Sequence, residues 1–210
     1  LTNGNETDFT DFNYLTSNQR VDYIIEQTNY YGYSGERVKG LMFCSSKKEA
    51  AALSERLNLR GYRTIALSGE DSQEKREDAI DRLVSDTRSD YLQYILTVDI
   101  FNEGVDIPEI NQVVLLRPTQ SPIVFVQQLG RGLRKSKDKE YVVILDFIGN
   151  YKNNFMIPIA LSGDRSYNKD NIRRYVLEGE RIIPGSSTIH FDEISKKQIF
   201  ASIDTANFAD

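Results

Sequence analysis

From Gly40 onward, short apolar runs alternate with segments whose apolar residues recur every three or four positions. The short runs predict buried β-strands, and the periodic segments predict amphipathic helices. The predicted strands are residues 41–44, 64–67, 94–97, 113–116 and 141–147, the last of them strongly β-prone and fully buried. Strands and helices in this alternation predict parallel β-α-β units, with helices covering both faces of the sheet.

Capping residues mark where the predicted helices begin and end. The first helix covers residues 17–31, with one apolar face made by Val21, Ile24, Ile25 and Thr28, and Gly32 closes it. Ser46 and Glu49 form a capping box for a second helix, which ends at Gly61. The segment 71–74 caps a third helix with Ala79, Ile80 and Leu83 inward, and Pro122 opens a fourth that leads to residue 134.

The two ends of the chain lack this rhythm. Residues 1–13 predict a flexible lead-in, so we divide the chain into 1–34 (lead-in and helix), 35–150 (α/β domain) and 151–210 (C-terminal extension). After a linker at 150–154 the extension predicts a helix at 171–177, a turn at 184–187, a strand at 188–191 and a helix at 192–203. Its core is poor, so it either packs on the main domain or begins a further module.

In parallel sheets ligands bind beyond the carboxyl ends of the strands. Ser45, Ser68 and Thr97 each follow or end a predicted strand, which places them on that edge. Tyrosines 30, 31 and 33 form a cluster after the first helix; exposed, they would stack on bases, but such tyrosines more often cover the edge of a core, and we favour the second interpretation.

Residues 127–134 read QQLGRGLR, which places Arg131 and Arg134 one helical turn apart on the same face. Arginine stays charged near pH 7, and its planar fork suits phosphate oxygens, so two forks on one face can grip a phosphate during its transfer. Gly130 lets another backbone or a ligand approach closely. A surface helix end with basic residues is the plainer alternative for two arginines alone.

Four segments in order resemble motifs of the superfamily 2 helicases and translocases. Residues 41–46 (LMFCSS) resemble motif IV, and Ser68–Glu70 with Gln73–Arg76 resembles the segment that carries the family's Gln-x-x-Arg element. Residues 97–108 (TVDIFNEGVDIP) resemble motif V, and 127–134 resemble motif VI. The wording of motif VI is closest to the restriction-subunit and repair-helicase branches, and less like the DEAD-box RNA helicases.

This resemblance implies a three-layer RecA-like (P-loop NTPase-like) fold and a nucleotide side. ATP would lie between this domain and a first RecA-like domain, with Arg131 and Arg134 reaching the γ-phosphate and Arg134 the better candidate for the arginine finger. Gly104, Asp106 and Gly130 would line the nucleotide, and Gln127 would orient the arginines or the attacking water. Asp106 also suits a turn before Pro108, and that alternative stays open.

The resemblance also implies a nucleic-acid side. Ser45, Gly69 and Thr97 would contact strand phosphates without reading sequence, although a strand-end hydroxyl such as that of Thr97 equally satisfies a loop. Gln73 and Arg76 either contact nucleic acid or brace motif IV, and bracing is favoured. Expected partners are nucleic acid (DNA rather than RNA), the first RecA-like domain of the same chain and a nuclease or restriction module.

No Gly-x-x-x-x-Gly-Lys-[Ser/Thr] loop occurs in the sequence, and no Asp-Glu box occurs in the α/β domain 35–150. The family carries both in its first RecA-like domain, so the resemblance implies that ATP and Mg²⁺ are held mainly there. We therefore expect this chain, which starts at Leu1, to be the second domain of a longer protein and to be inactive alone.

Composition limits the remaining possibilities. The net charge of −5 and the pI near 5.1 argue against a surface coated for nucleic acid, although five basic residues gather between 131 and 139. Cys44 is the single cysteine and is expected to be a buried, inert thiol; His190 is the single histidine and has no assigned role. No metal site and no membrane span are expected, and cytoplasmic location is the default.

Two other classes of function stay open. One is a RecA-like scaffold that docks proteins without catalysis, although it would have no use for two arginines on one face. The other is a free-standing doubly wound enzyme with another cofactor, which the absence of Gly-x-Gly-x-x-Gly after a strand disfavours.

Overall fold

The computed structural model describes residues 16–98, 107–117, 136–147, 166, 168–182 and 193–205. The chain divides into two compact units, one of residues 1–117 with 129–147 and the other of residues 118–128 with 148–210. The first unit contains α2 (Asn18–Tyr31), β1 (Gly40–Phe43), α3 (Lys47–Leu59), β2 (Thr64–Leu67), α4 (Gln73–Val84), β3 (Tyr94–Thr97), β4 (Gln112–Leu115) and β5 (Val143–Asp146).

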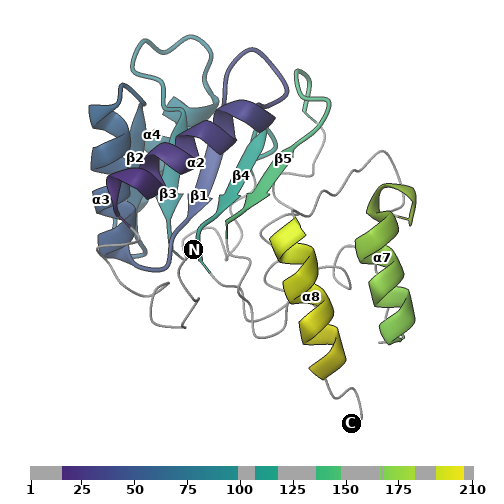
Figure 1. Ribbon diagram of the computed structural model, residues 1–210. Helices are drawn as coiled ribbons and strands as arrows, with labels where there is room; N and C mark the ends of the chain where they lie inside the picture. Colours follow the sequence, from purple (N-terminus) through teal and green to yellow (C-terminus); the bar gives the residue numbers. More distant parts are fainter. Residues whose placement is uncertain are drawn as a thin grey trace. The chain divides into compact units, whose positions relative to one another are not determined.

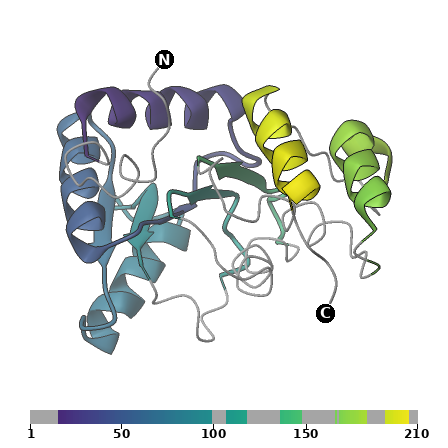
Figure 2. The same ribbon diagram turned by 60° about the horizontal axis from the view of Figure 1, so that its bottom comes forward.

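The five strands form one sheet in the order β2-β3-β1-β4-β5, and every neighbouring pair is parallel. Helices α2 and α3 cover one face of this sheet, and α4 lies on the other (Figures 1 and 2). The predicted α/β class, the parallel sheet and the three layers are confirmed. The strand bounds agree with the sequence to within one residue, except in β5.

The core follows from the alternation of side chains along the central strands. All four positions of β1, β3 and β4 are buried, because each of these strands has a strand on both sides and a helix layer on one face or both. Met42 and Cys44 belong to the cluster that packs beneath α2 and α3, whereas Leu41 and Phe43 alternate to the α4 face. Cys44 is buried as predicted, and burial raises the pKa of its thiol, so it stays protonated.

The caps predicted at the starts of α3 and α4 are confirmed, and α2 also begins with a capping serine. The hydroxyls of Ser17, Ser46 and Ser72 accept hydrogen bonds from the amides of Arg20 (3.2 Å), Glu49 (3.1 Å) and Lys75 (3.3 Å). Gly32 and Gly61 follow α2 and α3 with φ of 65° and 87°, a backbone conformation that favours glycine.

Two predictions about the edges of the core are wrong. Strand β5 is an edge strand, so only Leu145 is buried, and Tyr141 at the start of the predicted run is 54% exposed. The tyrosine cluster does not cover the core either, because the side chain of Tyr30 is 79% exposed and packs edge-to-face on Tyr31 instead. Both residues lie in the last turn of α2; Tyr30 is on the side away from the buried Val21 and Ile24, whereas Tyr31 is on the side of Ile24 but is still 44% exposed at the end of the helix.

The second unit contains two described helices, α7 (Lys169–Ile182) and α8 (Glu193–Thr205), which pack on each other. Ile172 and Val176 of α7 and Ile199 and Ile203 of α8 are buried. Arg173 joins the pair by an ion pair with Asp204. The two helices predicted in the extension are therefore confirmed, with α7 longer than predicted.

Other predicted elements lie outside the described residues: the lead-in 1–13, the helix from Pro122, the linker 150–154, the turn 184–187 and the strand 188–191. Within the described part of the chain, no helix combines the length and apolar character needed to cross a membrane.

Candidate functional site

Three of the predicted site residues meet at the carboxyl edge of the sheet. Ser45 follows β1, Thr97 ends β3, and Gly69 follows β2. In the sheet β3 lies between β1 and β2, so the three positions follow one another along the edge, about 5 Å from strand to strand. The loops after β1 and β2 are also joined by an ion pair of 2.5 Å between Lys47 and Glu70.

Ser45 is exposed at this edge, and its hydroxyl also interacts with the carboxylate of Glu49. The last ladder bond on its side is donated by the amide of Cys44 to the carbonyl of Thr97 at 2.8 Å. The amide of Ser45 is therefore beyond the sheet, and it donates to Oε2 of Glu49 at 2.6 Å. Glu49 therefore holds both the backbone amide and the hydroxyl of this exposed residue from behind.

Thr97 is placed differently. Its side chain is completely buried, and its Oγ1 has no hydrogen-bond partner among the described residues. An unpaired buried hydroxyl is uncommon, because burial without a partner costs free energy. Thr97 thus lies at the predicted edge, but beneath the surface rather than on it.

The loop after β2 exposes Gly69 on a rigid frame. A side chain added at Gly69 would meet no atom within 4 Å. The carboxylate of Asp71 accepts the amide of Ser68 at 2.6 Å, and Arg76 donates to the carbonyls of Gly69 (3.3 Å) and Asp71 (2.8 Å). The bond from Lys75, followed by that from the Ser68 amide, lowers the pKa of Asp71, so this carboxylate is charged at neutral pH.

The prediction that Gln73 and Arg76 brace the segment 41–46 is therefore wrong. Arg76 braces its own loop, residues 69–71, and not the segment 41–46, because it lies in the first turn of α4 with its guanidinium directed back to the preceding loop. Gln73 donates to Glu77 on the exposed surface of the same helix.

Two residues that the sequence analysis left without a function lie directly behind Ser45. Glu49 is fully buried, and Arg20, which is nearly buried, approaches its carboxylate at 3.8 Å. Burial is the main cause that raises the pKa of Glu49, while the bond from the Ser45 amide and the charge of Arg20 act in the opposite direction. The capping box signalled Glu49, but nothing in the sequence paired it with a residue 29 positions earlier.

Two of the five basic residues between 131 and 139, Lys137 and Lys139, lie in the described part of the chain. Arg131, Arg134 and Lys135 lie outside the described residues, and Lys137 is exposed. Lys139 is half-buried, and its ammonium donates to the carbonyls of Pro108 (2.6 Å) and Ile110 (3.0 Å) just before β4. It is thus at the amino edge of the sheet, and it cannot belong to a basic rim on the carboxyl edge.

The predicted nucleotide residues Gly104, Asp106, Gln127 and Gly130 also lie outside the described residues. In the described ranges no group of three or more His, Cys, Asp or Glu side chains could hold a metal ion. The described residues therefore offer no fit for Mg²⁺.

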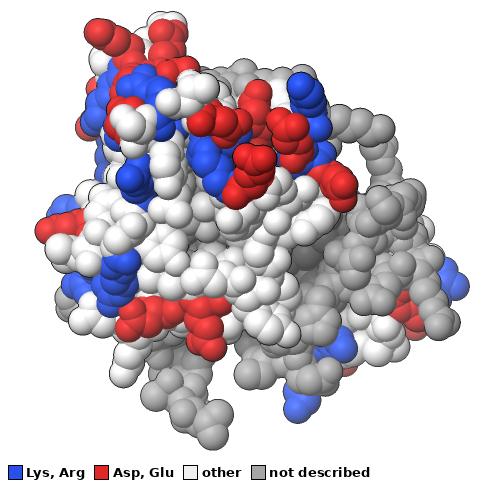
Figure 3. All heavy atoms as spheres, turned by 90° about the horizontal axis from the view of Figure 1, so that it is seen from above, with Lys and Arg blue, Asp and Glu red and all other residues white. Residues whose placement is uncertain are grey.

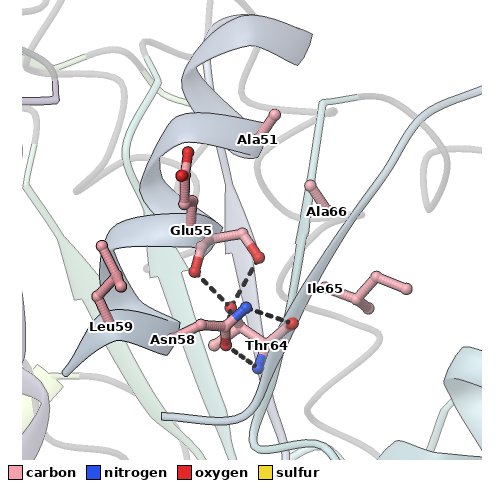
Figure 4. A pocket seen from close by; sticks show the side chains of 8 residues that line it. Ala51, Glu55, Asn58, Leu59, Thr64, Ile65 and Ala66 are labelled. Atoms are coloured by element: carbon pink, nitrogen blue, oxygen red, sulfur yellow. Dashed lines mark hydrogen bonds between the residues drawn. The ribbon is translucent and has the colours of Figure 1, made fainter. Parts of the chain in front are cut away.

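One hollow on the described surface lies away from this edge. A groove of about 560 Å³ lies between α3 and the edge strand β2 (Figure 4). The side-chain amide of Asn58 crosses it: Oδ1 accepts the amide of Thr64 at 2.8 Å, and Nδ2 donates to the carbonyl of Thr64 at 3.1 Å. Asn58 thereby occupies backbone groups that an added strand would need.

A parallel α/β sheet with helices on both faces and polar loops on its carboxyl edge is a doubly wound architecture, the class to which RecA-like domains belong. Residues 19–136 match the family described as the Helicase conserved C-terminal domain, and the chain belongs to this family of superfamily 2 helicase domains.

Individual relatives share 27–30% of their residues with this chain over the matched segments. The chain is 27% identical over 153 residues to "Putative ATP-dependent helicase IRC3" of Saccharomyces cerevisiae, covering 72% of this chain and 22% of the yeast protein. It is 30% identical over 102 residues to the ATP-dependent RNA helicase SrmB of Haemophilus influenzae, covering 49% and 22%. Each of these relatives is thus far longer than the chain.

Among solved structures, the fragment of a "putative HsdR subunit of a type I restriction enzyme" from Vibrio vulnificus YJ016 has a TM-score of 0.58 at 20% identity, with 73% of this chain and 30% of that one covered. At this level of identity the likeness shows the fold alone. It agrees with the RecA-like assignment.

Proposed function

We propose that this chain is the second motor domain of an ATP-dependent helicase or translocase, which grips the phosphates of a nucleic-acid strand and supplies arginine to ATP bound at a first RecA-like domain. DNA is the proposed strand, and a nuclease or restriction module is a proposed partner in the full-length protein, which we expect in the cytoplasm.

The observation that carries the proposal is the convergence of Ser45, Thr97 and Gly69 on three adjacent strand ends, in a chain of the helicase C-terminal family. Phosphate contacts need hydroxyls, backbone amides and room for the strand, and not a strongly basic surface. Ser45 provides a hydroxyl and Gly69 provides room on the exposed edge, which reconciles nucleic-acid binding with a net charge of −5.

On the nucleotide side, the proposal gives each residue of motifs V and VI one task. Arg134, with Arg131 one turn before it, supplies planar donors to the phosphate oxygens as charge grows on them. Gln127 orients these arginines or the attacking water, and Gly130 permits the close approach. Gly104 and Asp106 line the nucleotide. Bound Mg²⁺ would supply further charge neutralisation, from the first domain.

The test is Arg134→Lys in the full-length protein. Lysine keeps the positive charge but loses the planar fork, and an arginine finger is typically worth 10³–10⁵ in turnover. We therefore expect the ATPase rate at saturating single strands to fall by at least about 10³-fold, while nucleotide affinity changes only a few-fold. Arg173→Lys, on α7 in the other unit, is the matched control and should leave the rate unchanged.

If the ATPase rate of Arg134→Lys stays within a few-fold of wild type, Arg134 is not the catalytic arginine. The same measurement on Arg131→Lys then tests whether Arg131 has that role. If neither substitution slows hydrolysis, the domain is a non-catalytic scaffold. Circular dichroism of each variant separates a lost contact from a lost fold.

A further inference from the structure

The strongest unexplained feature of the described chain is a buried ion pair directly beneath the exposed edge. Glu49 has no exposed surface, and the side chain of Arg20 is 11% exposed, yet both are charged residues. They come from the first turns of α3 and α2, which are separated by strand β1 in the chain. Burying a charge is costly unless it is paired and hydrogen-bonded, so the position calls for a reason beyond stability.

We propose that Glu49 and Arg20 are positioning residues, which hold the Ser45 loop so that the Ser45 hydroxyl meets a phosphate of the bound strand. This inference rests on the proposed function, because it concerns residues that support the same nucleic-acid-binding edge.

The first step is the contact between Glu49 and Ser45. At the end of β1 the ladder stops with Cys44, and the amide of Ser45 has no strand to pair with. Elsewhere such an amide bonds to water and the loop stays adaptable. Here the buried Oε2 of Glu49 accepts it at 2.6 Å, the short distance of a charge-assisted bond. The loop is thus fixed from below, and the hydroxyl of the exposed Ser45, which also interacts with Glu49, is oriented by it.

The second step is the support of Glu49 itself. Its own amide donates to Ser46 at 3.1 Å, and the first turn of a helix favours a negative charge. Arg20 lies 3.8 Å from Oε1, and its Nη2 also donates to the carbonyl of Leu116, one residue beyond β4, at 3.4 Å. Arg20 therefore connects the start of α2, the start of α3 and the end of β4 behind Ser45.

A positioning role predicts a change in strand affinity on loss of the Glu49 carboxylate that is opposite in sign to the change expected from charge alone. Removing a carboxylate near a phosphate backbone should tighten binding if charge alone matters, and removing an arginine should weaken it. If the pair acts by positioning, both changes weaken binding, because each one releases the Ser45 loop. A second substitution after the first then has little left to disrupt, so the effects are not additive.

The experiment uses the full-length protein and a labelled single-stranded deoxythymidine oligonucleotide of about 20 nucleotides, at one fixed salt concentration. The variants are Glu49→Gln, Arg20→Met and the double variant. Glu70→Gln removes an equal charge from an exposed rim carboxylate and is the matched control, since Glu70 is exposed and holds only Lys47. Ser45→Ala reports on the contact itself.

We expect Glu49→Gln and Arg20→Met each to raise Kd by about three- to tenfold, as for one lost hydrogen bond. The double variant should bind no more weakly than the weaker single variant, and Glu70→Gln should leave Kd unchanged or lower it. ATPase measurements should show the same rise in the KM for the oligonucleotide, with kcat at saturation within about twofold. A purely structural pair would instead lower the melting temperature and leave KM unchanged.

Contrary outcomes distinguish a failure of the positioning role from a failure of the proposed function. If Ser45→Ala weakens binding but Glu49→Gln leaves it unchanged or tightens it, the positioning role is overturned and the proposed function stands. If wild type does not bind the oligonucleotide, the proposed function fails and this inference with it. Should a single variant unfold, the double variant decides, because replacing a whole buried pair is often tolerated: wild-type affinity there overturns the role.

Discussion

The two edges of the sheet use their polar side chains in opposite ways. At the amino edge, Asn111 and Gln112 are buried and their amide groups are spent on the protein's own backbone. Asn111 accepts the amide of Lys39 at 2.8 Å and donates to the carbonyls of Ser34 (2.7 Å) and Arg37 (2.8 Å). At the carboxyl edge, by contrast, Ser45 is exposed, and the buried hydroxyl of Thr97 has no hydrogen-bond partner among the described residues.

The charged residues repeat this contrast. Arg37 donates to the carbonyls of Leu83, Ser85 and Leu92, and so closes the end of α4 at the amino edge. The face seen from above in Figure 3 accordingly mixes positive and negative side chains. Charge alone therefore does not locate a site in this molecule. Buried polar groups without a partner locate it better, because the great majority of buried polar groups in folded proteins are hydrogen-bonded.

The largest expected effect on this comparison comes from Asn111→Ala. The substitution leaves two carbonyls and one amide unpaired in a buried position, so we expect unfolding in denaturant to lose about 3 kcal/mol. Ser45→Ala at the opposite edge should change stability by less than about 0.5 kcal/mol. A stable Asn111→Ala protein would show that water replaces the amide there, and the contrast between the edges would then weaken.

Alanine substitutions at Gly40, on the amino edge, and Gly69, on the carboxyl edge, test the same contrast with a smaller expected change in stability. A side chain at Gly40, the first residue of β1, would overlap the ring of Tyr94, which is itself held by a hydrogen bond of 2.6 Å from its hydroxyl to Gln112. We expect Gly40→Ala to lose about 2 kcal/mol of stability.

Gly69→Ala is the matched control, because the space around Gly69 is open, and its stability should stay within about 0.5 kcal/mol of wild type. Strand affinity should respond in the reverse order. It should fall for Gly69→Ala and remain unchanged for the folded fraction of Gly40→Ala. Equal losses of stability at both positions would contradict the assignment of the carboxyl edge as the open one.

The smallest expected effect is the dependence of stability on pH. A hydrogen bond from Lys39 is the main cause that lowers the pKa of Asp86, next to the end of α4, and one from Arg88 lowers the pKa of Asp90 to about 2. A lowered carboxyl pKa stabilises the fold above the unfolded value, near 4, and this contribution is lost as the pH falls toward 2.

Melting temperatures measured from pH 7 to pH 2 should therefore be flat at the upper end and fall below about pH 4. Asp86→Asn should make that fall shallower by removing one of the titrating groups. Asp22→Asn, at an exposed ion pair with Arg60, is the control at neutral pH and should change the melting temperature little. An unchanged slope for Asp86→Asn would mean that Asp86 is equally well paired in the unfolded chain.

The sequence by itself determined the elements and their class. Strands 64–67 and 94–97 were predicted to the residue, and Ser17, Ser46 and Ser72 were identified as helix starts, because apolar periodicity and capping act within a few neighbouring residues. The order of four motifs also indicated the helicase family, which the match over residues 19–136 confirms.

Only the tertiary structure decided which positions are edges and which polar groups have partners. The apolar run 141–147 gave no sign that β5 is at the margin of the sheet, and the lysine run gave no sign that Lys139 serves the amino edge. Arg20 and Glu49 are 29 residues apart in the chain and meet only when α2 and α3 pack on the same face. Strand order and long-range pairing are cooperative properties of the packed sheet, and so no local pattern contains them.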